Sequence, residues 1–250
     1  MTPARAQVFT LVTSLRPAFR ILKLWITPPG LTVSIRHSLT GIAGMLCYSF
    51  GMARMGESLP PVVLASASPR RSELLSHLPV DFTVIPSDAT EVHNEHLTVR
   101  EVCLVNAYRK ARVVAKHFPD HLVLGADTLV SMNNRLYGKP ADISDSERML
   151  NELQGKTHEV VTGVCLMHLR KHRVKNFCET TWVTFKALRP EVIHDYVMKV
   201  ATLDKAGAYG IQEFGDMLVA DINGSFDNVV GLPTESLRRA LTEWRQARAV

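Results

Sequence analysis

The chain of 250 residues is long enough for one or two domains with a substantial core, and its 46% hydrophobic and 21% charged residues are ordinary for a globular protein. The formal net charge is +5, but residues 1–56 hold six of the 29 basic residues and no Asp or Glu. The remaining 194 residues hold the other 23 basic and all 24 acidic residues, a formal charge of −1. A body so close to neutrality gives no support to a general nucleic-acid-binding role, and we expect no nucleic-acid partner.

Residues 1–56 form a basic segment that differs in composition from the rest of the chain. Its longest apolar stretch, residues 41–52, is far shorter than the ~20 residues that span a bilayer, so we expect no membrane partner. Three interpretations remain open: an Arg-rich organellar transit peptide, a surface-bound amphipathic segment, or translated upstream sequence with the true start at Met52 or Met55. We favour the last, because MARMGESLPPVVLA leads directly into a strand, and we expect residues 57–250 alone to form the fold.

From Pro61 onward, apolar runs bounded by turn residues alternate with segments of helical spacing. Strands are expected at residues 62–66, 82–87, 121–134, 158–169, 176–188 and 216–224, and helices at 69–78, 98–118, 142–155, 189–200 and 233–247. Residues 204–215 form a glycine-rich loop between the last two of these strands. This alternation predicts an α/β architecture with a mixed sheet.

The segment LASASPRR, residues 64–71, joins the first strand to the first helix through small residues and a proline. A helix N-terminus presents unpaired backbone N–H groups and the positive end of the helix dipole, and both attract anions. Ser66 and Ser68 add hydroxyl donors, and Arg70 and Arg71 add guanidiniums that fit phosphate oxygens. The alternative is that both arginines are solvated first-turn residues, but the dipole opposes cations there. The segment therefore favours a polyphosphate site.

Asp127 interrupts an apolar strand in the sequence HLVLGADTLV. A carboxylate in such a strand is costly to bury unless it meets a metal, a base or water. Asp127 is thus a candidate metal ligand or general base. The alternative is a structural aspartate that caps a turn.

Five further residues are weaker candidates. Lys139 lies in the turn YGKP, where an ammonium could reach phosphate, and Lys110 is one of several basic residues in AYRKAR. Glu91 and His93 lie in a polar loop, and a single histidine is seldom a ligand. Gln212 has glycines on both sides, which let backbone approach a ligand closely, so its amide could read the edge of a nucleobase.

The four cysteines, Cys47, Cys103, Cys165 and Cys178, contain no CxxC pair and no Cys/His cluster at zinc spacing. We expect free thiols that occupy small core positions. Free thiols also favour a reducing compartment, here the cytoplasm.

Several of these motifs occur together in one order: LASASPRRSELL, LGADTLV, LYGKP, RMLNELQGKTHEVVTGV, LDKAGAYGIQ and NVVGLP. In this combination the chain resembles the Maf family of nucleoside triphosphate pyrophosphatases. The resemblance covers about Val62 to Trp244 and leaves out the basic N-terminal segment.

The resemblance implies an elongated, two-lobed α/β fold with a mixed sheet and a central cleft, similar to that of the inosine triphosphate pyrophosphatases. It also implies an enzyme, a hydrolase that splits a nucleoside triphosphate into the monophosphate and pyrophosphate. The implied cofactor is a divalent cation, Mg²⁺, Mn²⁺ or Co²⁺. A second copy of the chain, as a homodimer, is an expected partner besides the nucleotide substrate.

The resemblance further implies roles for individual residues, with Asp127 as the general base. The family's phosphate-handling positions match Ser68, Arg71, Lys110 and Lys139, and its metal-associated positions match Glu91 and Asp127. The acidic run common in the family differs here, where the loop reads PSDATEVHNEH, so Asp88 is an alternative to Glu91.

Three further positions decide substrate choice in the family, and they match Arg70, Thr128 and Gln212. This combination resembles the branch that hydrolyses dTTP and UTP. Two alternatives remain: a pyrophosphatase for 7-methyl-GTP or other modified nucleotides, and a non-catalytic nucleotide-binding regulator of cell division. A panel of nucleoside triphosphates would separate them.

Overall fold

The computed structural model describes residues 8–13, 20–25, 34–35, 59–94 and 96–246. The chain divides into two units, Met1–Met55 and Gly56–Val250. In the first, β1 (Val8–Thr13), β2 (Arg20–Trp25) and β3 (Ser34–Ile35) form an antiparallel sheet in that order. Most of residues 1–56, Cys47 among them, lies outside the described residues, so the expectation that this segment is no part of the fold stays a prediction.

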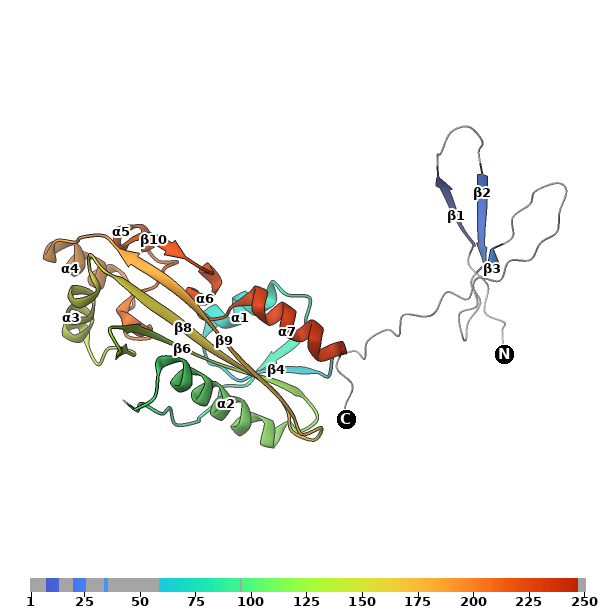
Figure 1. The fold of residues 1–250 in the computed structure, drawn as a ribbon, viewed down its shortest axis with the longest axis horizontal. Coiled ribbons are helices and arrows are strands. Elements are labelled where there is room, and N and C mark those ends of the chain that lie inside the picture. The colour runs from blue at the N-terminus through green and yellow to red at the C-terminus, as the bar shows by residue number, and fades with distance from the viewer. Residues whose placement is uncertain (1–7, 14–19, 26–33, 36–58, 95, 247–250) are drawn as a thin grey trace. The chain divides into compact units, whose positions relative to one another are not determined.

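The second unit is built on a seven-stranded mixed sheet with the order β10-β9-β8-β6-β4-β5, and β7 pairs with β6 (Figure 1). Within this sheet the two parallel pairs are those of β4 with β5 and of β4 with β6, and the other pairs are antiparallel. The strands are β4 (Val62–Leu64), β5 (Phe82–Val84), β6 (Leu122–Met132), β7 (Arg135–Tyr137), β8 (Thr157–His168), β9 (Arg173–Phe185) and β10 (Val219–Asn223). The expected α/β class with a mixed sheet is confirmed.

Helices cover both faces of this sheet (Figure 1). They are α1 (Pro69–Ser76), α2 (Val99–His117), α3 (Ile143–Leu153), α4 (Pro190–Lys199), α5 (Gly215–Leu218), α6 (Phe226–Val230) and α7 (Thr234–Gln246). Helix α2 packs on one face through a cluster that includes Val123, and α1 and α7 pack on the other through a cluster that includes Leu124. Successive residues of β6 therefore serve opposite faces, as the pleat of a strand requires.

Two hydrophobic cores lie toward opposite ends of β6 and β8. The first joins β4, α1 and α7 to the start of β6, with Leu64, Leu75, Leu124, Leu237 and Trp244 among its members. The second joins α3, α4 and α5 to the far end of β6, with Leu150, Phe185, Ile193, Tyr196 and Leu218 among its members. We call these ends the first and second lobes. The long strands run through both, so the middle of β6 lies between the lobes.

Most expected elements are present, but the strand expected at residues 216–224 is wrong in its first part. Residues Gly215–Leu218 form helix α5, which buries Leu218 in the second core, and the strand begins only at Val219. Helix α6, which the sequence reading did not predict, is capped by Ser225, whose Oγ accepts a hydrogen bond from the backbone N–H of Asn228. Both helices are too short for a periodic pattern to show.

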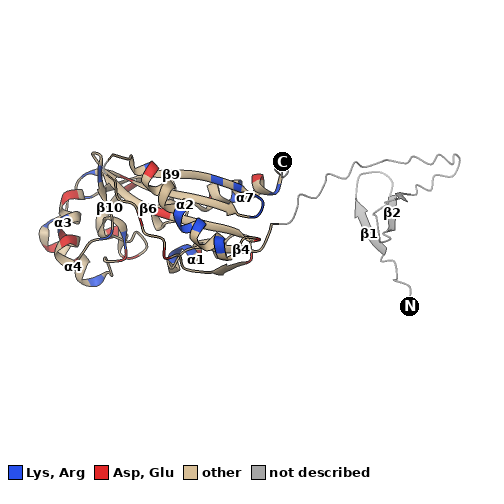
Figure 2. Cartoon of the chain, turned by 90° about the horizontal axis from the view of Figure 1, so that it is seen from below, with Lys and Arg blue, Asp and Glu red and all other residues tan. Residues whose placement is uncertain are grey.

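Charge is mixed over the described fold. Lys and Arg residues stand out on α1 and α2, and acidic residues stand out on α3 (Figure 2). Within the described residues, no helix is both long enough and apolar enough to span a bilayer. Cys103 and Cys165 are buried free thiols and Cys178 is a half-buried one, as the spacing predicted.

Candidate active site

The candidate site begins at a gap in the sheet. Strand β4 pairs with β6 only as far as Leu124, and β7 pairs with β6 only from Val130. Between these pairs, on that side of β6, no described strand hydrogen-bonds to residues 125–129. The gap lies at the carboxyl end of β4. The helix after β4 (α1) and the helix before β6 (α2) cover opposite faces of the sheet, and ligands of α/β proteins bind at such points. A cavity of about 500 Å³ opens here.

Two glycines bring α2 unusually close to the sheet below this gap. A Cβ atom on Gly125 would lie 2.3 Å from the carbonyl oxygen of Ala107, and one on Gly163 would lie 2.5 Å from that of Cys103. Gly125 and Gly163 belong to the adjacent strands β6 and β8. The close approach lets polar side chains of α2 reach Asp127 from above the sheet.

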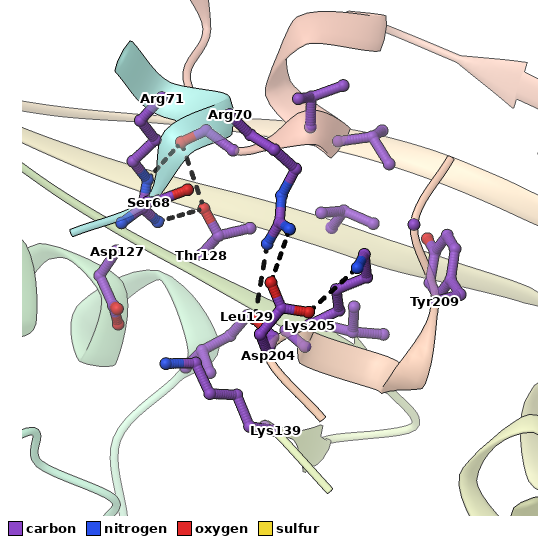
Figure 3. A pocket seen from close by; sticks show the side chains of 18 of the residues that line it. Ser68, Arg70, Arg71, Asp127, Thr128, Leu129, Lys139, Asp204, Lys205 and Tyr209 are labelled. Atoms are coloured by element: carbon purple, nitrogen blue, oxygen red, sulfur yellow. Dashed lines mark hydrogen bonds and ion pairs between the residues drawn. The ribbon is translucent and has the colours of Figure 1, made fainter. Parts of the chain in front are cut away.

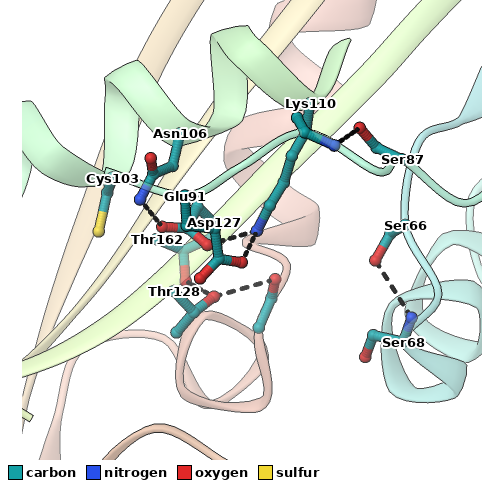
Figure 4. A network of polar contacts seen from close by, with 12 residues as sticks. Ser66, Ser68, Ser87, Glu91, Cys103, Asn106, Lys110, Asp127, Thr128 and Thr162 are labelled. Carbon is teal, nitrogen blue, oxygen red and sulfur yellow. Dashed lines mark hydrogen bonds and ion pairs between the residues drawn. The ribbon is translucent and has the colours of Figure 1, made fainter. Parts of the chain in front are cut away.

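Where α2 borders the cavity, its Lys110 bridges two carboxylates, those of Asp127 and Glu91 (Figure 4). Its Nζ lies 2.6 Å from Oδ1 of Asp127 and 2.7 Å from Oε1 of Glu91. The side chains of Lys110 and Asp127 are only 13% and 6% exposed, so this contact is largely shielded from water. Burial acts to raise the pKa of Glu91, but the hydrogen bond and charge of Lys110, with Lys139 and His93, outweigh it and hold this pKa below its ordinary value.

Asn106 holds the second oxygen of Asp127. Its Nδ2 donates to Oδ2 of Asp127 at 3.0 Å and to the backbone oxygen of Val92 at 3.2 Å. Its Oδ1 accepts from the backbone N–H of Val92 at 2.7 Å. The amide thus fixes both the carboxylate and the loop that carries Glu91.

Arg71 lies on the opposite face of β6, next to Thr128 (Figure 3). Its Nη2 donates to Oγ1 of Thr128 at 3.0 Å, and its Nε donates to the carbonyl oxygen of Gly231 at 2.9 Å. Burial, the largest influence, lowers the pKa of Arg71, while the charge of Asp127 acts in the other direction. Ser66 contributes its Oγ, which accepts from Nη1 of Arg71 at 3.4 Å and from the backbone N–H of Ser68 at 3.2 Å.

The far end of the cavity is bounded by the loop between α4 and α5. Arg70 reaches across to Asp204, and its Nη1 donates to Oδ2 at 2.8 Å (Figure 3). Oδ1 of Asp204 accepts from Nζ of the buried Lys205 at 3.0 Å. Gln212 lines the same end and is exposed.

The nine residues to which the family resemblance gives roles all line this one cavity: Ser68, Arg70, Arg71, Glu91, Lys110, Asp127, Thr128, Lys139 and Gln212. Asp88, the alternative to Glu91, lies instead in a separate surface groove with Arg109 and Arg112. The structure thus brings Glu91, rather than Asp88, next to Asp127.

The sequence reading missed three residues that matter to the geometry: Asn106, Asp204 and Lys205. Asn106 follows Val102 and Cys103 at helical spacing, so a polar residue on the buried face of α2 was the available signal. Asp204 and Lys205 lie in the glycine-rich loop, where nothing in the pattern shows that Lys205 is buried.

Two carboxylates in the cavity, those of Glu91 and Asp127, could serve as ligands of a divalent metal. Among the described residues, no group of three or more His, Cys, Asp or Glu side chains is placed to hold a metal. Glu91 and Asp127 do face one common cation, the Nζ of Lys110. A Mg²⁺ ion commonly takes one or two carboxylates and completes its shell with substrate phosphates and water, so this pair fits such an ion.

Known proteins are similar to this chain over most of its length. The family described as Maf-like protein matches residues 61–244. A dTTP/UTP pyrophosphatase of Bacillus cereus (strain ATCC 10987 / NRS 248) is 41% identical over 189 residues, which are 76% of this chain and 92% of the relative. A dTTP/UTP pyrophosphatase of Akkermansia muciniphila is 40% identical over 183 residues, which are 73% of this chain and 96% of the relative.

Among solved structures, a HAM1 protein from Coxiella burnetii is 15% identical, with a TM-score of 0.43, and covers 74% of this chain and all of its own. The family match spans most of the chain and contains every residue of the cavity described above. This chain therefore belongs to the Maf family.

Proposed function

We propose that this chain is a nucleoside triphosphate pyrophosphatase that hydrolyses dTTP and UTP to the monophosphate and pyrophosphate. One observation carries the proposal: a single cavity holds the buried carboxylate of Asp127 beside Lys110, Arg71 and Lys139. Support also comes from curated relatives of about 40% identity that are named dTTP/UTP pyrophosphatase and are covered over 92% and 96% of their length.

The charges of the cavity separate into two ends. At the end with Asp127, the cations Arg71, Lys110 and Lys139 face the carboxylates of Asp127 and Glu91. At the other end, Arg70 and Lys205 are balanced by Asp204 and Glu213. The first end has the surplus of positive charge, so it suits the triphosphate, and the balanced end suits the neutral base.

That surplus is one charge, whereas a triphosphate carries about four negative charges. A divalent cation held by Glu91 and Asp127 would supply more positive charge, and Mg²⁺, Mn²⁺ or Co²⁺ is the cofactor that we propose. When bound, it would polarise the phosphate and lower the barrier to attack by water.

Asp127 would orient the attacking water and accept its proton. Lys110 and Asn106 hold its two oxygens, and each carboxylate oxygen has a further lone pair for a proton. Arg71, Lys110 and Lys139 would stabilise the charge that develops on the departing pyrophosphate.

Base selection falls to Arg70, Thr128 and Gln212. The amide of Gln212 offers one donor and one acceptor, which match the O4 and N3–H of thymine or uracil. Cytosine reverses both, and a buried polar group left without a partner is strongly disfavoured. A pyrophosphatase of this kind suits the cytoplasm, in keeping with the free thiols of the described residues. The homodimer stays a prediction.

The test of this function is a panel of nucleoside triphosphates with detection of pyrophosphate, with Mg²⁺, Mn²⁺ and Co²⁺ in turn. We expect dTTP and UTP to give the highest kcat/KM, with dCTP, the purine triphosphates and 7-methyl-GTP well below. Release of orthophosphate in place of pyrophosphate would contradict the chemistry, and a preference for 7-methyl-GTP would contradict the assigned substrate.

A substitution tests the role of Asp127. Asp127→Asn keeps the shape of the side chain but removes the base, so we expect kcat to fall about 10²- to 10⁴-fold with the fold intact. Asp120→Asn, at an exposed aspartate paired with Arg170, is the matched control and should keep wild-type kcat. A wild-type rate in Asp127→Asn would rule out a general base at this position.

A further inference from the structure

A buried ammonium lies behind the base end of the cavity. Lys205 is only 5% exposed. Its Nζ is 2.6 Å from the carbonyl oxygen of Ala201, 3.0 Å from Oδ1 of Asp204 and 3.1 Å from Oε1 of Glu213. A lysine ammonium has three N–H donors, so these three oxygens account for all of them. Lys205 therefore has no donor left for a phosphate, although it lines the cavity.

One of these partners leads to Arg70. Asp204 binds Lys205 through Oδ1 and Arg70 through Oδ2, and its backbone oxygen accepts a second, 3.4 Å contact from Nη2 of Arg70. Burial acts to raise the pKa of Asp204, but the hydrogen bonds and charges of Arg70 and Lys205 outweigh it and keep this carboxyl charged. The direction in which Arg70 points thus depends on a carboxylate that Lys205 anchors.

The other partner leads to Gln212. Glu213 follows it in the chain, and the ion pair between Glu213 and Lys205 ties the end of the loop to the lysine. The start of the same stretch packs on the lysine stem, since a Cβ atom on Gly210 would lie 2.6 Å from Cε of Lys205. Tyr196 also fixes Gly210, because its Oη accepts a hydrogen bond of 3.0 Å from the Gly210 N–H.

The two residues that Lys205 positions come from distant parts of the chain. Arg70 belongs to α1, in the first lobe, and Gln212 belongs to the loop of the second lobe. Removal of the buried cation leaves Glu213 without this ion-pair partner, and the carboxylate then turns toward water. Asp204, whose side chain is already 56% exposed, keeps its ion pair with Arg70 but loses its anchor to the loop, so the pair is no longer fixed in position.

We propose that Lys205 is a positioning residue for substrate choice: it fixes Arg70, through Asp204, and Gln212, through Glu213, so that both contact one pyrimidine base. The inference rests on the proposed pyrophosphatase function and adds a determinant of selectivity to it. Lys205 affects recognition of the base through Arg70 and Gln212 and has no part in the hydrolysis of the phosphoric anhydride.

The test uses Lys205→Met in the full chain. Methionine keeps an apolar stem for Gly210 to pack on but removes the charge. We expect the ratio of kcat/KM for dTTP to that for dCTP to fall about 10- to 100-fold, mainly through a higher KM for dTTP. Inorganic tripolyphosphate, which has no base, should inhibit the variant and the wild-type enzyme equally. Lys199→Met, at an exposed lysine of α4, is the matched control and should keep wild-type selectivity.

Asp204→Asn is a second variant, chosen because an exposed substitution is tolerated even where Lys205→Met unfolds the loop. It weakens the contacts of Asp204 with Arg70 and Lys205 but leaves the ion pair of Lys205 with Glu213, so a smaller loss of selectivity is expected. Wild-type selectivity in folded Lys205→Met, or in Asp204→Asn where Lys205→Met does not fold, overturns the inference. Weaker inhibition by tripolyphosphate, in step with the rise in KM, overturns it as well, because Lys205 would then act on phosphates. A wild-type enzyme that hydrolyses no pyrimidine triphosphate overturns the proposed function first, and the inference with it.

Discussion

At the scale of single residues, Asn106 decides how the general base is presented. One amide makes three hydrogen bonds, one with Asp127 and two with the backbone of Val92. The strand that carries Asp127 and the loop that carries Glu91 are thereby held in fixed relation. Asn106 is only 1% exposed, so none of these bonds competes with bulk water.

Asn106→Leu tests this role. The variant keeps a side chain of similar size but removes the amide that holds Oδ2 of Asp127 and the backbone of Val92, so the carboxylate is no longer fixed for its role as general base. We expect kcat to fall about 10-fold or more. Asn151→Leu, at an exposed asparagine of α3, is the control. A wild-type kcat in folded Asn106→Leu would contradict this role.

The residues of the site were predictable to different degrees. Asp127 was predictable because a carboxylate within an apolar strand is costly to bury without a partner. Arg70 and Arg71 were predictable because the helix dipole opposes two cations in the first turn of a helix. Asn106 and Lys205 did not, because their importance comes from partners that only the fold brings near. Burial of a lysine within a glycine-rich loop leaves no mark on the periodicity of the sequence.

At the scale of elements, the packing of α2 against β6 and β8 sets the depth of the site. Two glycines in neighbouring strands allow the helix backbone to contact the sheet directly. Asn106 and Lys110 are therefore close enough to hydrogen-bond with a side chain of the strand itself. A helix at the usual distance from a sheet would leave the carboxylate of Asp127 without these partners.

Gly125→Ala should destabilise the protein strongly. The added methyl would lie 2.3 Å from the carbonyl oxygen of Ala107 and 2.8 Å from the backbone N of Ala111, and neither can move without the helix. Overpacking costs about 1–3 kcal/mol, and contact with backbone places this variant at or above the upper end. Gly138→Ala is the control, since its nearest neighbour would be 4.0 Å away. Urea midpoints measure both, and equal midpoints would contradict the direct contact.

Elements were predictable in proportion to their length. Helix α2, with apolar residues at helical spacing over 19 residues and a Thr98–Glu101 capping box at its start, matches the expected range closely. Helices α5 and α6 have four and five residues. Helix α5 follows from the burial of Leu218, and α6 follows from the Ser225 cap and the burial of Val230. Their sequences carry too few turns for spacing to separate helix from strand.

At the scale of the whole domain, a ring cluster in the second lobe links the core to the cavity. His158, Phe185 and Tyr209 meet edge to face, and Nε2 of His158 lies 2.9 Å from Oη of Tyr209. Tyr209 also lines the cavity. Burial lowers the pKa of His158 from its ordinary 6.5 to about 4, so this histidine is neutral in the folded protein at neutral pH.

This shift predicts how stability depends on pH. In the unfolded chain His158 takes up a proton near pH 6.5, but in the folded protein only near pH 4, so stability is lost as the pH falls from about 6.5 to about 4. The loss amounts to about 3 kcal/mol. His158→Gln keeps a partner for Tyr209 without the titration and should flatten the curve in this range. His96→Gln, at an exposed histidine, should follow the wild type. Identical curves for all three proteins would contradict the assignment.

The gap between β4 and β7 has a consequence for evolution and design. The cavity exists because β4 stops after three residues and β7 starts six positions further along β6. Strand lengths, rather than the side chains that line it, thus create the space. Residues of the lining can be exchanged one by one while the cavity persists, so new base preferences can arise on an unchanged scaffold. Conversely, a β4 lengthened by a few paired residues would fill the gap and abolish binding with every catalytic side chain still present.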